Sequence, residues 1–201
     1  YNISCESLIT KINQYPKSEL SNSAIIAVDL FGLPADYNTI CDTAMQSGLY
    51  LISEAAQSFG GSIGSQKVGK LSPITTTSFY PTKPLSCYGD GGAVFTDDDE
   101  IAMKIKSIRS HGITDNPYEN VRIGTNARFD AIQAAVILSK LKIFDEELSK
   151  RESTSRIYNQ ELKNIVETPI TTNQVKSAWA HYTIRTRDRD CLLYTSDAAD
   201  E

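Results

Sequence analysis

Residues 24–53 read AIIAVDLFGLPADYNTICDTAMQSGLYLIS, and this stretch decides the fold class. Two short apolar runs, residues 24–28 and 49–52, lie at its ends and are typical of buried strands. Between them, Asp36 precedes a stretch with apolar residues at helical spacing, and Gly48 ends it. A strand, a helix and a second strand in this order predict a β-α-β unit with two parallel strands.

Working outward from this unit, the pattern continues toward the C-terminus. A threonine-rich run at residues 74–79 and an apolar run at residues 93–96 predict two more strands. Helical patterns cover about residues 97–109 and residues 129–148, and alternation over residues 182–187 predicts a further strand. Strands that alternate with helices in this way indicate an α/β domain.

Composition narrows the classes of function. The chain has 201 residues, of which 20 are Lys or Arg and 25 are Asp or Glu, so no basic excess indicates a nucleic-acid partner. The apolar runs are much shorter than a membrane span. The four cysteines form no CxxC pair, which favours free thiols in a reducing cytoplasm over a metal site or disulfides.

The end of the chain has an unusual sequence. Residues 191–201 read CLLYTSDAADE and resemble a translated sequencing adapter. We expect this segment to be a non-native tail, which is left out of fold reasoning. The alternative is a natural acidic tail.

The segment after the third predicted strand carries the most informative side chain. Lys83 lies between Pro81 and Pro84 and close to the glycines of residues 89–92. A lysine placed there can form a Schiff base with a carbonyl cofactor or substrate if the site favours the neutral amine. The alternative is an ordinary solvated lysine. Ser78, at the end of the strand, can donate to a phosphate or can be a simple turn hydroxyl.

Two further groups of polar residues are candidates. Glu54 ends the second predicted strand, where a carboxylate can pair with a protonated pyridine nitrogen, and Gln57 can reach the same ring. The alternative is a helix-start acid with an exposed amide beside it. Arg122, Asn126 and Arg128 lie in a loop before an apolar helix, which indicates either a polar cap or an anion site.

Together these motifs resemble the DegT/StrS family of pyridoxal-phosphate-dependent nucleotide-sugar aminotransferases. The similarity covers about residues 22–190, and five motifs occur in the family's order and spacing. They are SEAAQS at 53–58, SFYPTKPL at 78–85, GDGGAV at 89–94, HG at 111–112 and IGTNARFDAIQAA at 123–135. Within the family, the chain is most similar to the aminotransferases that act on UDP-2-acetamido-2-deoxy-3-oxo-glucuronate.

The resemblance implies a fold and a domain organisation. The fold is the three-layer α/β large domain of the PLP-transferases, which is aspartate aminotransferase-like (fold type I), here incomplete and followed by the start of a small α+β domain. Residues 1–150 would form the partial cofactor-binding large domain. Residues 151–190 would form a linking helix and the start of the small C-terminal domain. A cytoplasmic homodimer with shared active sites is expected.

The resemblance also implies a role for each matching residue. Lys83 matches the lysine that holds pyridoxal 5'-phosphate covalently, and Ser78 matches the hydroxyl that binds the phosphate. Gln57 matches the side chain beside the ring hydroxyl. Asn126 matches a residue that reaches the neighbouring subunit's phosphate, and Arg128 matches its companion near the substrate.

Glu54 departs from the family's pattern. It stands where the family has Asp, paired with the pyridine nitrogen, because the usual Glu-Asp pair is here Ser53-Glu54. The extra methylene would place the carboxylate about 1.5 Å further out. A displacement of about 1 Å can lower a rate by about a hundredfold.

The implied activity is transfer of an amino group from glutamate to a keto group of a nucleotide-activated sugar, for cell-surface polysaccharide or related glycan biosynthesis. Lys83 would move the proton as general base and acid. Nothing in the sequence indicates a metal. Three alternatives stay open: a sugar dehydratase, whose members carry His at the position of Lys83; a binding or regulatory domain with this fold and no transaminase activity; and an inactive truncated fragment.

Overall fold

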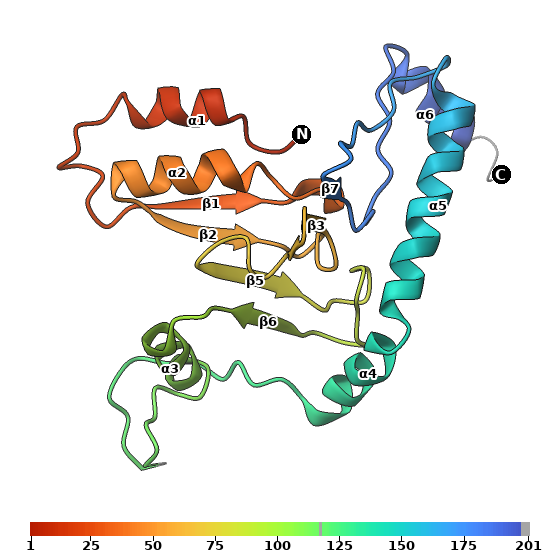
Figure 1. Ribbon diagram of the computed structural model, residues 1–201. Helices are drawn as coiled ribbons and strands as arrows, with labels where there is room; N and C mark the ends of the chain where they lie inside the picture. Colours follow the sequence, from red (N-terminus) through yellow and green to blue (C-terminus); the bar gives the residue numbers. More distant parts are fainter. Residues whose placement is uncertain (117, 198–201) are drawn as a thin grey trace.

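The fold is built around a four-stranded sheet. The structure is a computed structural model that describes residues 1–116 and 118–197. The strands occur in the spatial order β1 (Ala24–Val28), β2 (Tyr50–Glu54), β5 (Ile74–Ser78) and β6 (Gly92–Phe95). The first three are parallel, and β6 runs antiparallel to β5. Figure 1 shows that the carboxyl ends of the three parallel strands therefore lie at the same side of the sheet.

Helices and a second, smaller sheet complete the described structure. The helices are α1 (Cys5–Ile12), α2 (Tyr37–Ser47), α3 (Asp99–Ile108), α4 (Ala131–Leu141), α5 (Phe144–Leu162) and α6 (Arg189–Asp197), and Leu30–Gly32 forms a 3-10 turn. The smaller sheet is antiparallel and has the order β4 (Gln66–Lys67), β3 (Ser62–Ile63) and β7 (Val175–Lys176). It joins the end of the main sheet to the C-terminal part of the chain.

The predicted β-α-β unit is confirmed. The Asp36 carboxylate accepts a hydrogen bond from the Thr39 backbone N–H and so caps α2. Gly48 ends the helix in the left-handed conformation, with φ 67°. The two strands pair in parallel, with Ala24 opposite Tyr50 and Val28 opposite Glu54. Local signals in the sequence were sufficient here because each end of the helix has its own capping residue.

The main core lies between the sheet and α2. Ile25, Ala27 and Leu51 project from one face of the sheet and pack against Ile40 and Ala44 of the helix. The helix α1 packs on the outer side of α2, as Figure 1 shows. Burial of the isoleucine and leucine side chains among them contributes about 1.5–3 kcal/mol each, and it fixes the face of the sheet that turns away from solvent.

The prediction that residues 24–28 form a buried strand is wrong for three of the five side chains. Ile26 is 60% exposed and Val28 is 38% exposed, while their neighbours Ile25 and Ala27 are buried. Tyr50, in register with Ala24, is 64% exposed on the same face. Within the described residues, helices cover one face of the sheet, so the strand shows the alternation of a one-sided sheet.

Two later elements also differ from the predictions. The helix predicted over residues 129–148 is divided at Lys142 and Ile143 into α4 and α5, because Phe144 turns inward and stacks on Phe59 with ring centroids 5.9 Å apart. The strand predicted over residues 182–187 is absent from the described structure, where one bridge joins Arg185 to Glu167.

The predicted boundaries after residue 150 stay predictions. The helix α5 runs without interruption through that position. The predicted non-native tail begins inside α6, and its residues 198–201 lie outside the described part of the chain. Among the described residues, no helix combines the length and the apolar character that crossing a bilayer requires.

Gly32 is a close contact between the sheet and the C-terminal part of the chain. It has φ 104°, and a Cβ atom there would lie 2.8 Å from the backbone nitrogens of Trp179 and Ala180. Its carbonyl oxygen also accepts a hydrogen bond from the Ala178 N–H. Backbone atoms on both sides leave room only for glycine.

We therefore expect Gly32→Ala to lower the free energy of unfolding by at least about 2 kcal/mol, because it adds a steric clash to the cost of the positive φ. Gly64→Ala is the matched control, since Gly64 has φ 56° and open space around it. Urea unfolding of both variants measures the difference. Equal losses for the two variants would contradict the close contact at Gly32.

Candidate functional site

The register of the parallel strands brings two of the candidate side chains to one face of the sheet. Glu54 lies opposite Val28 on one side and Thr76 on the other. Ser78 is two residues further along β5, so it shares the face of Thr76 and Glu54. At about 3.3 Å per residue, the serine lies about 7 Å further along the strand direction. The Glu54 carboxylate and the Ser78 hydroxyl therefore lie on the same face of the sheet, at the carboxyl ends of neighbouring strands.

The Glu54 side chain is turned back toward its own strand end. Its Oε1 atom accepts a hydrogen bond of 2.9 Å from the Ala56 backbone N–H. Its second oxygen, Oε2, has no hydrogen-bond partner within the described residues. The carboxylate is therefore held by one oxygen and can accept a proton donor at the other.

Gln57 is oriented by Phe31, a residue that the sequence motifs did not indicate. Its Oε1 atom accepts a 2.6 Å hydrogen bond from the backbone N–H of Phe31. Phe31 has φ 62° in the 3-10 turn that follows β1. Because the amide oxygen is occupied, the Nε2 end of Gln57 is the end that can donate to another group.

Lys83 lies in a loop that is closed at its base. The Cys87 N–H donates to the Phe79 carbonyl oxygen over 2.8 Å, and the Phe79 N–H donates to the Gly91 carbonyl oxygen over 2.8 Å. Within the loop, the Lys83 N–H donates to the Tyr80 carbonyl oxygen over 2.9 Å. Lys83 is half-buried, and none of the ion pairs of the described residues includes its amine.

The helix α4 holds the far side of the same loop. Gln133 Oε1 accepts a 2.8 Å hydrogen bond from the Tyr88 N–H, and Lys140 Nζ donates to Ser86 Oγ over 3.1 Å. The Lys140 amine also lies 4.9 Å from the centre of the Tyr88 ring, which is a cation–π distance. The sequence predicted neither contact, since the loop and the helix are far apart along the chain.

Ser78 keeps its hydroxyl hydrogen available. The Ser78 Oγ atom accepts a hydrogen bond of 3.2 Å from the Tyr80 N–H. A hydroxyl that accepts in this way still has its own O–H to donate. An anion such as a phosphate oxygen is a suitable acceptor for that donor.

Among the described residues, the side chains of Asn126 and Arg128 bond to each other and not to the candidate side chains of this edge. Both are exposed, and Arg128 Nε donates to Asn126 Oδ1 over 3.0 Å. Within the described residues, neither contacts Glu54, Gln57, Ser78 or Lys83, and Arg122 is likewise exposed.

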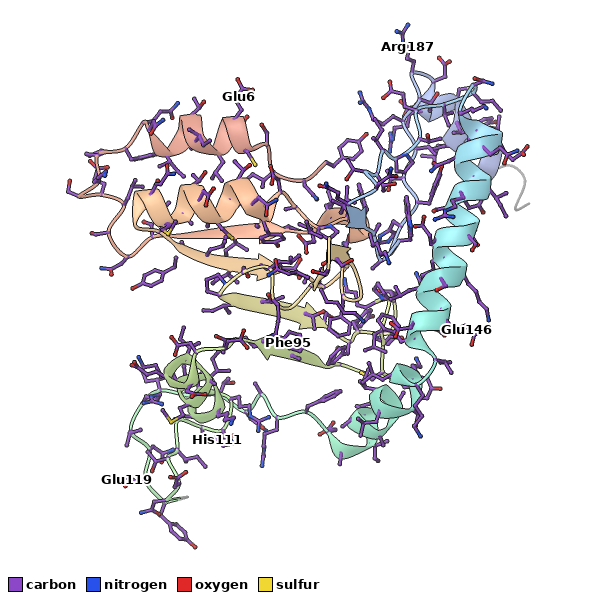
Figure 2. The ribbon with its side chains drawn as sticks, viewed as in Figure 1. Glu6, Phe95, His111, Glu119, Glu146 and Arg187 are labelled. Carbon is purple, nitrogen blue, oxygen red and sulfur yellow. The ribbon has the colours of Figure 1, made fainter. Side chains whose placement is uncertain are left out.

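These arginines and Asn126 belong to the long segment between α3 and α4. Figure 2 shows His111 and Glu119 on this segment, with Glu119 near its far end, away from the sheet.

A buried polar network lies directly behind the edge, and the sequence analysis missed it. Asp29 is fully buried, and its Oδ1 accepts hydrogen bonds from the Tyr37 hydroxyl (2.8 Å) and the Ala35 N–H (2.9 Å). Its Oδ2 accepts one from the Ser58 hydroxyl (2.5 Å). The Tyr37 oxygen also lies 2.6 Å from Ser53 Oγ. The sequence signal that could have indicated this network is the position of Asp29, a carboxylate directly after an apolar run.

Charge in this network is sensitive to pH. Burial raises the pKa of the Asp29 carboxyl above its ordinary value, the negative charge of Glu54 adds to the rise, and the three hydrogen-bond donors oppose it. Burial also raises the pKa of the Tyr37 phenol, which therefore stays protonated and donates.

Because the pKa of Asp29 is higher in the folded state, the folded state binds this proton more tightly than the unfolded state does. The stabilisation from that proton is lost as the pH rises from about 3.8 through the folded pKa. We therefore expect the free energy of unfolding of the wild type to fall relative to that of Asp29→Asn over this range. At higher pH, the free energies of the two proteins should change with pH in parallel. Urea unfolding at a series of pH values measures this. A pH-independent difference would refute the assignment.

The side chains at the edge fit the cofactor that the sequence motifs imply. They offer a lysine amine, a hydroxyl donor, a carboxylate with one free oxygen and an amide N–H donor. These groups suit the aldehyde, phosphate, pyridine nitrogen and ring hydroxyl of pyridoxal 5'-phosphate. Among the described residues, no cluster of three His, Cys, Asp or Glu side chains could hold a metal ion.

Comparison with known proteins gives consistent matches. The profile of the DegT/DnrJ/EryC1/StrS aminotransferase family matches residues 1–198. The UDP-2-acetamido-2-deoxy-3-oxo-D-glucuronate aminotransferase of Pseudomonas aeruginosa is 43% identical over 177 residues, which are 88% of this chain and 49% of that protein. The dTDP-3-amino-3,4,6-trideoxy-alpha-D-glucose transaminase of Streptomyces venezuelae is 34% identical over 177 residues, 87% of this chain and 46% of that protein. The chain thus spans about half the length of these relatives.

Solved structures give the same result. A DegT DnrJ EryC1 StrS aminotransferase from Brucella abortus is 44% identical and superimposes with a TM-score of 0.93, over 100% of this chain and 54% of that one. DesV of S. venezuelae, solved with a ketimine intermediate, is 32% identical with a TM-score of 0.91, over 98% of this chain and 52% of that one. The predicted fold, including its incompleteness, is confirmed.

Proposed function

Because the chain belongs to the DegT/DnrJ/EryC1/StrS aminotransferase family, we propose that the protein containing it is a pyridoxal 5'-phosphate-dependent aminotransferase. It transfers an amino group from an amino-acid donor, glutamate, to a keto group of a nucleotide-activated sugar in glycan biosynthesis. The observation that carries this proposal is the meeting of Glu54, Gln57 and Ser78 at one strand edge, beside the closed loop of Lys83.

In the proposed reaction each residue of the edge has one task. When bound, the cofactor supplies an electron-accepting ring. Lys83 would hold the aldehyde through its amine, and the same amine would carry a proton to and from the reacting carbon. Glu54 Oε2 keeps the pyridine nitrogen protonated. Ser78 Oγ–H donates to the phosphate, and Gln57 Nε2 donates to the ring hydroxyl.

Asn126 and Arg128 have a different task in this proposal. They serve the neighbouring subunit of a homodimer, where Asn126 contacts the phosphate and Arg128 lies near the substrate. Their exposure supports this division, as does the absence, among the described residues, of a hydrogen bond from either side chain to Glu54, Gln57 or Ser78. A UDP-linked 3-keto sugar acid is the favoured substrate, given the relative at 43% identity. A cytoplasmic location stays a prediction.

One observation favours a second candidate function, a binding or regulatory domain that does not catalyse transamination. Glu54 already bonds the Ala56 N–H, and it is longer than the aspartate that the family uses there. A dehydratase is less well supported because residue 83 is lysine and not histidine.

Replacing Lys83 tests the proposed reaction. We expect Lys83→Ala in the complete protein to lose the visible absorbance of lysine-bound cofactor and to lower transamination by about 10²–10⁴-fold, because the proton carrier is removed. Lys17→Ala, at an exposed lysine, is the control and should leave both unchanged. Unaltered turnover in Lys83→Ala would contradict the assignment.

Replacing Glu54 tests its proposed task, and turnover of the wild type separates the two candidate functions. Glu54→Gln keeps the size but cannot hold a proton on the pyridine nitrogen, so we expect turnover to fall by about a hundredfold or more. Glu54→Asp should retain activity, since a carboxylate remains. Steady-state kinetics of the two variants provide the measurement. If both variants turn over like the wild type, Glu54 has no part in catalysis. If the wild type itself shows no transamination, the binding or regulatory alternative gains support.

A further inference from the structure

The segment that carries Glu54 and Gln57 is bounded at each end by a buried serine. Ser53 precedes it and is 1% exposed, and Ser58 follows it and is 0% exposed. The backbone inside the segment makes short-range bonds, such as Ser58 N–H to the Ala55 carbonyl oxygen. Ala55 is also bonded to β5, because its N–H donates to the Thr76 carbonyl oxygen over 2.8 Å and its carbonyl oxygen accepts from the Thr77 hydroxyl over 3.0 Å. These bonds hold the start of the segment, and its far end at residues 57 and 58 depends on other contacts.

Both serines connect to the carboxylate of Asp29. The Ser58 hydroxyl donates to Oδ2 directly. The Tyr37 hydroxyl has one hydrogen, which it donates to Oδ1, so it can accept the hydrogen of Ser53. One carboxylate therefore holds the segment at its two ends, by one direct bond and by one relay through a phenol.

The backbone around Asp29 holds the segment at two more points. The Asp29 N–H donates to the Glu54 carbonyl oxygen over 3.0 Å. Two residues later, the Phe31 N–H donates to the Gln57 side chain. The turn that presents Phe31 is itself fixed, because the Ala35 N–H at its far end donates to Asp29 Oδ1.

A buried carboxylate is costly unless several donors compensate for its lost hydration. Asp29 has three donors to its side chain, and removing an acceptor would leave buried donors unpaired. The fold therefore maintains a costly group, whose bonds lead to the turn after β1, to the start of α2 through Tyr37 and to the segment with Glu54 and Gln57.

We infer that Asp29 is a positioning residue, which fixes the Glu54–Gln57 segment against the sheet so that the carboxylate and the amide present their free atoms at the strand edge. It acts through Ser53, Ser58 and the Phe31 turn, since it is fully buried. The inference rests on the proposed function for its catalytic meaning. The structural part stands independently of any cofactor.

The test uses Asp29→Asn in the complete protein, because asparagine keeps the shape and loses one acceptor oxygen. In protein freed of cofactor, we expect hydrogen exchange of peptide amides in residues 53–58 to rise by about tenfold or more. On reconstitution, the dissociation constant of pyridoxal 5'-phosphate should rise by about 10-fold, and kcat should fall while KM changes little.

Two further variants make the result interpretable. Ser155→Ala removes a buried hydroxyl bond to the Glu152 carbonyl oxygen within α5, outside the Asp29 network, and it should change neither exchange at residues 53–58 nor cofactor affinity. Ser58→Ala removes only the direct bond to Asp29 and should give the same effects as Asp29→Asn at smaller size. If Asp29→Asn does not fold, exchange and cofactor affinity are measured on Ser58→Ala instead.

The outcomes distinguish failure of the inference about Asp29 from failure of the proposed function. Increased exchange at residues 53–58 together with weaker cofactor binding supports the inference. If Asp29→Asn, or Ser58→Ala in its place, exchanges and binds cofactor like Ser155→Ala, the inference is overturned. If the wild type binds no pyridoxal 5'-phosphate at all, the proposed function fails, and the exchange measurement alone then decides whether Asp29 holds the segment.

Discussion

The parallel register of β1, β2 and β5 is the constraint on which the rest of the structure depends. It sets Val28, Glu54 and Thr76 side by side, and with them it sets Ser78 on the same face. A shift of β2 by one residue would turn Glu54 toward the core and Ser53 toward solvent. The apolar partners of α2 prevent this shift, because Leu51 would then leave the core. Packing of one helix thus decides where the chemistry can occur.

Ser53 and Glu54, which are neighbours on β2, point to opposite faces of the sheet and have different roles. Ser53 points into the interior and joins the hydroxyl relay to Asp29, whereas Glu54 points outward and leaves one oxygen unbonded. The negative charge on the interior side comes from β1 through Asp29, so a small hydroxyl at residue 53 completes the network. This arrangement gives a physical role to the Ser53-Glu54 pair, which departs from the pattern of the family that the motifs resemble.

Parts of this structure could be predicted from the sequence because their causes are local. Asp36 and Gly48 delimit α2, and five motifs indicate both the fold and the loop of Lys83. Other parts depend on contacts between distant residues. The break before Phe144 follows from its stacking on Phe59, 85 positions away along the chain. Likewise, Asp29 and Ser58 are 29 positions apart and meet because β1 and β2 pair.

The central claim is that the amine of Lys83 carries the cofactor, and chemical trapping tests it most directly. The complete protein would be reduced with borohydride, digested, and mapped by mass spectrometry. The account predicts a pyridoxyl group on the peptide that contains Lys83 and on no other peptide. A protein that gains no such group, or gains it on a different lysine, would contradict the account.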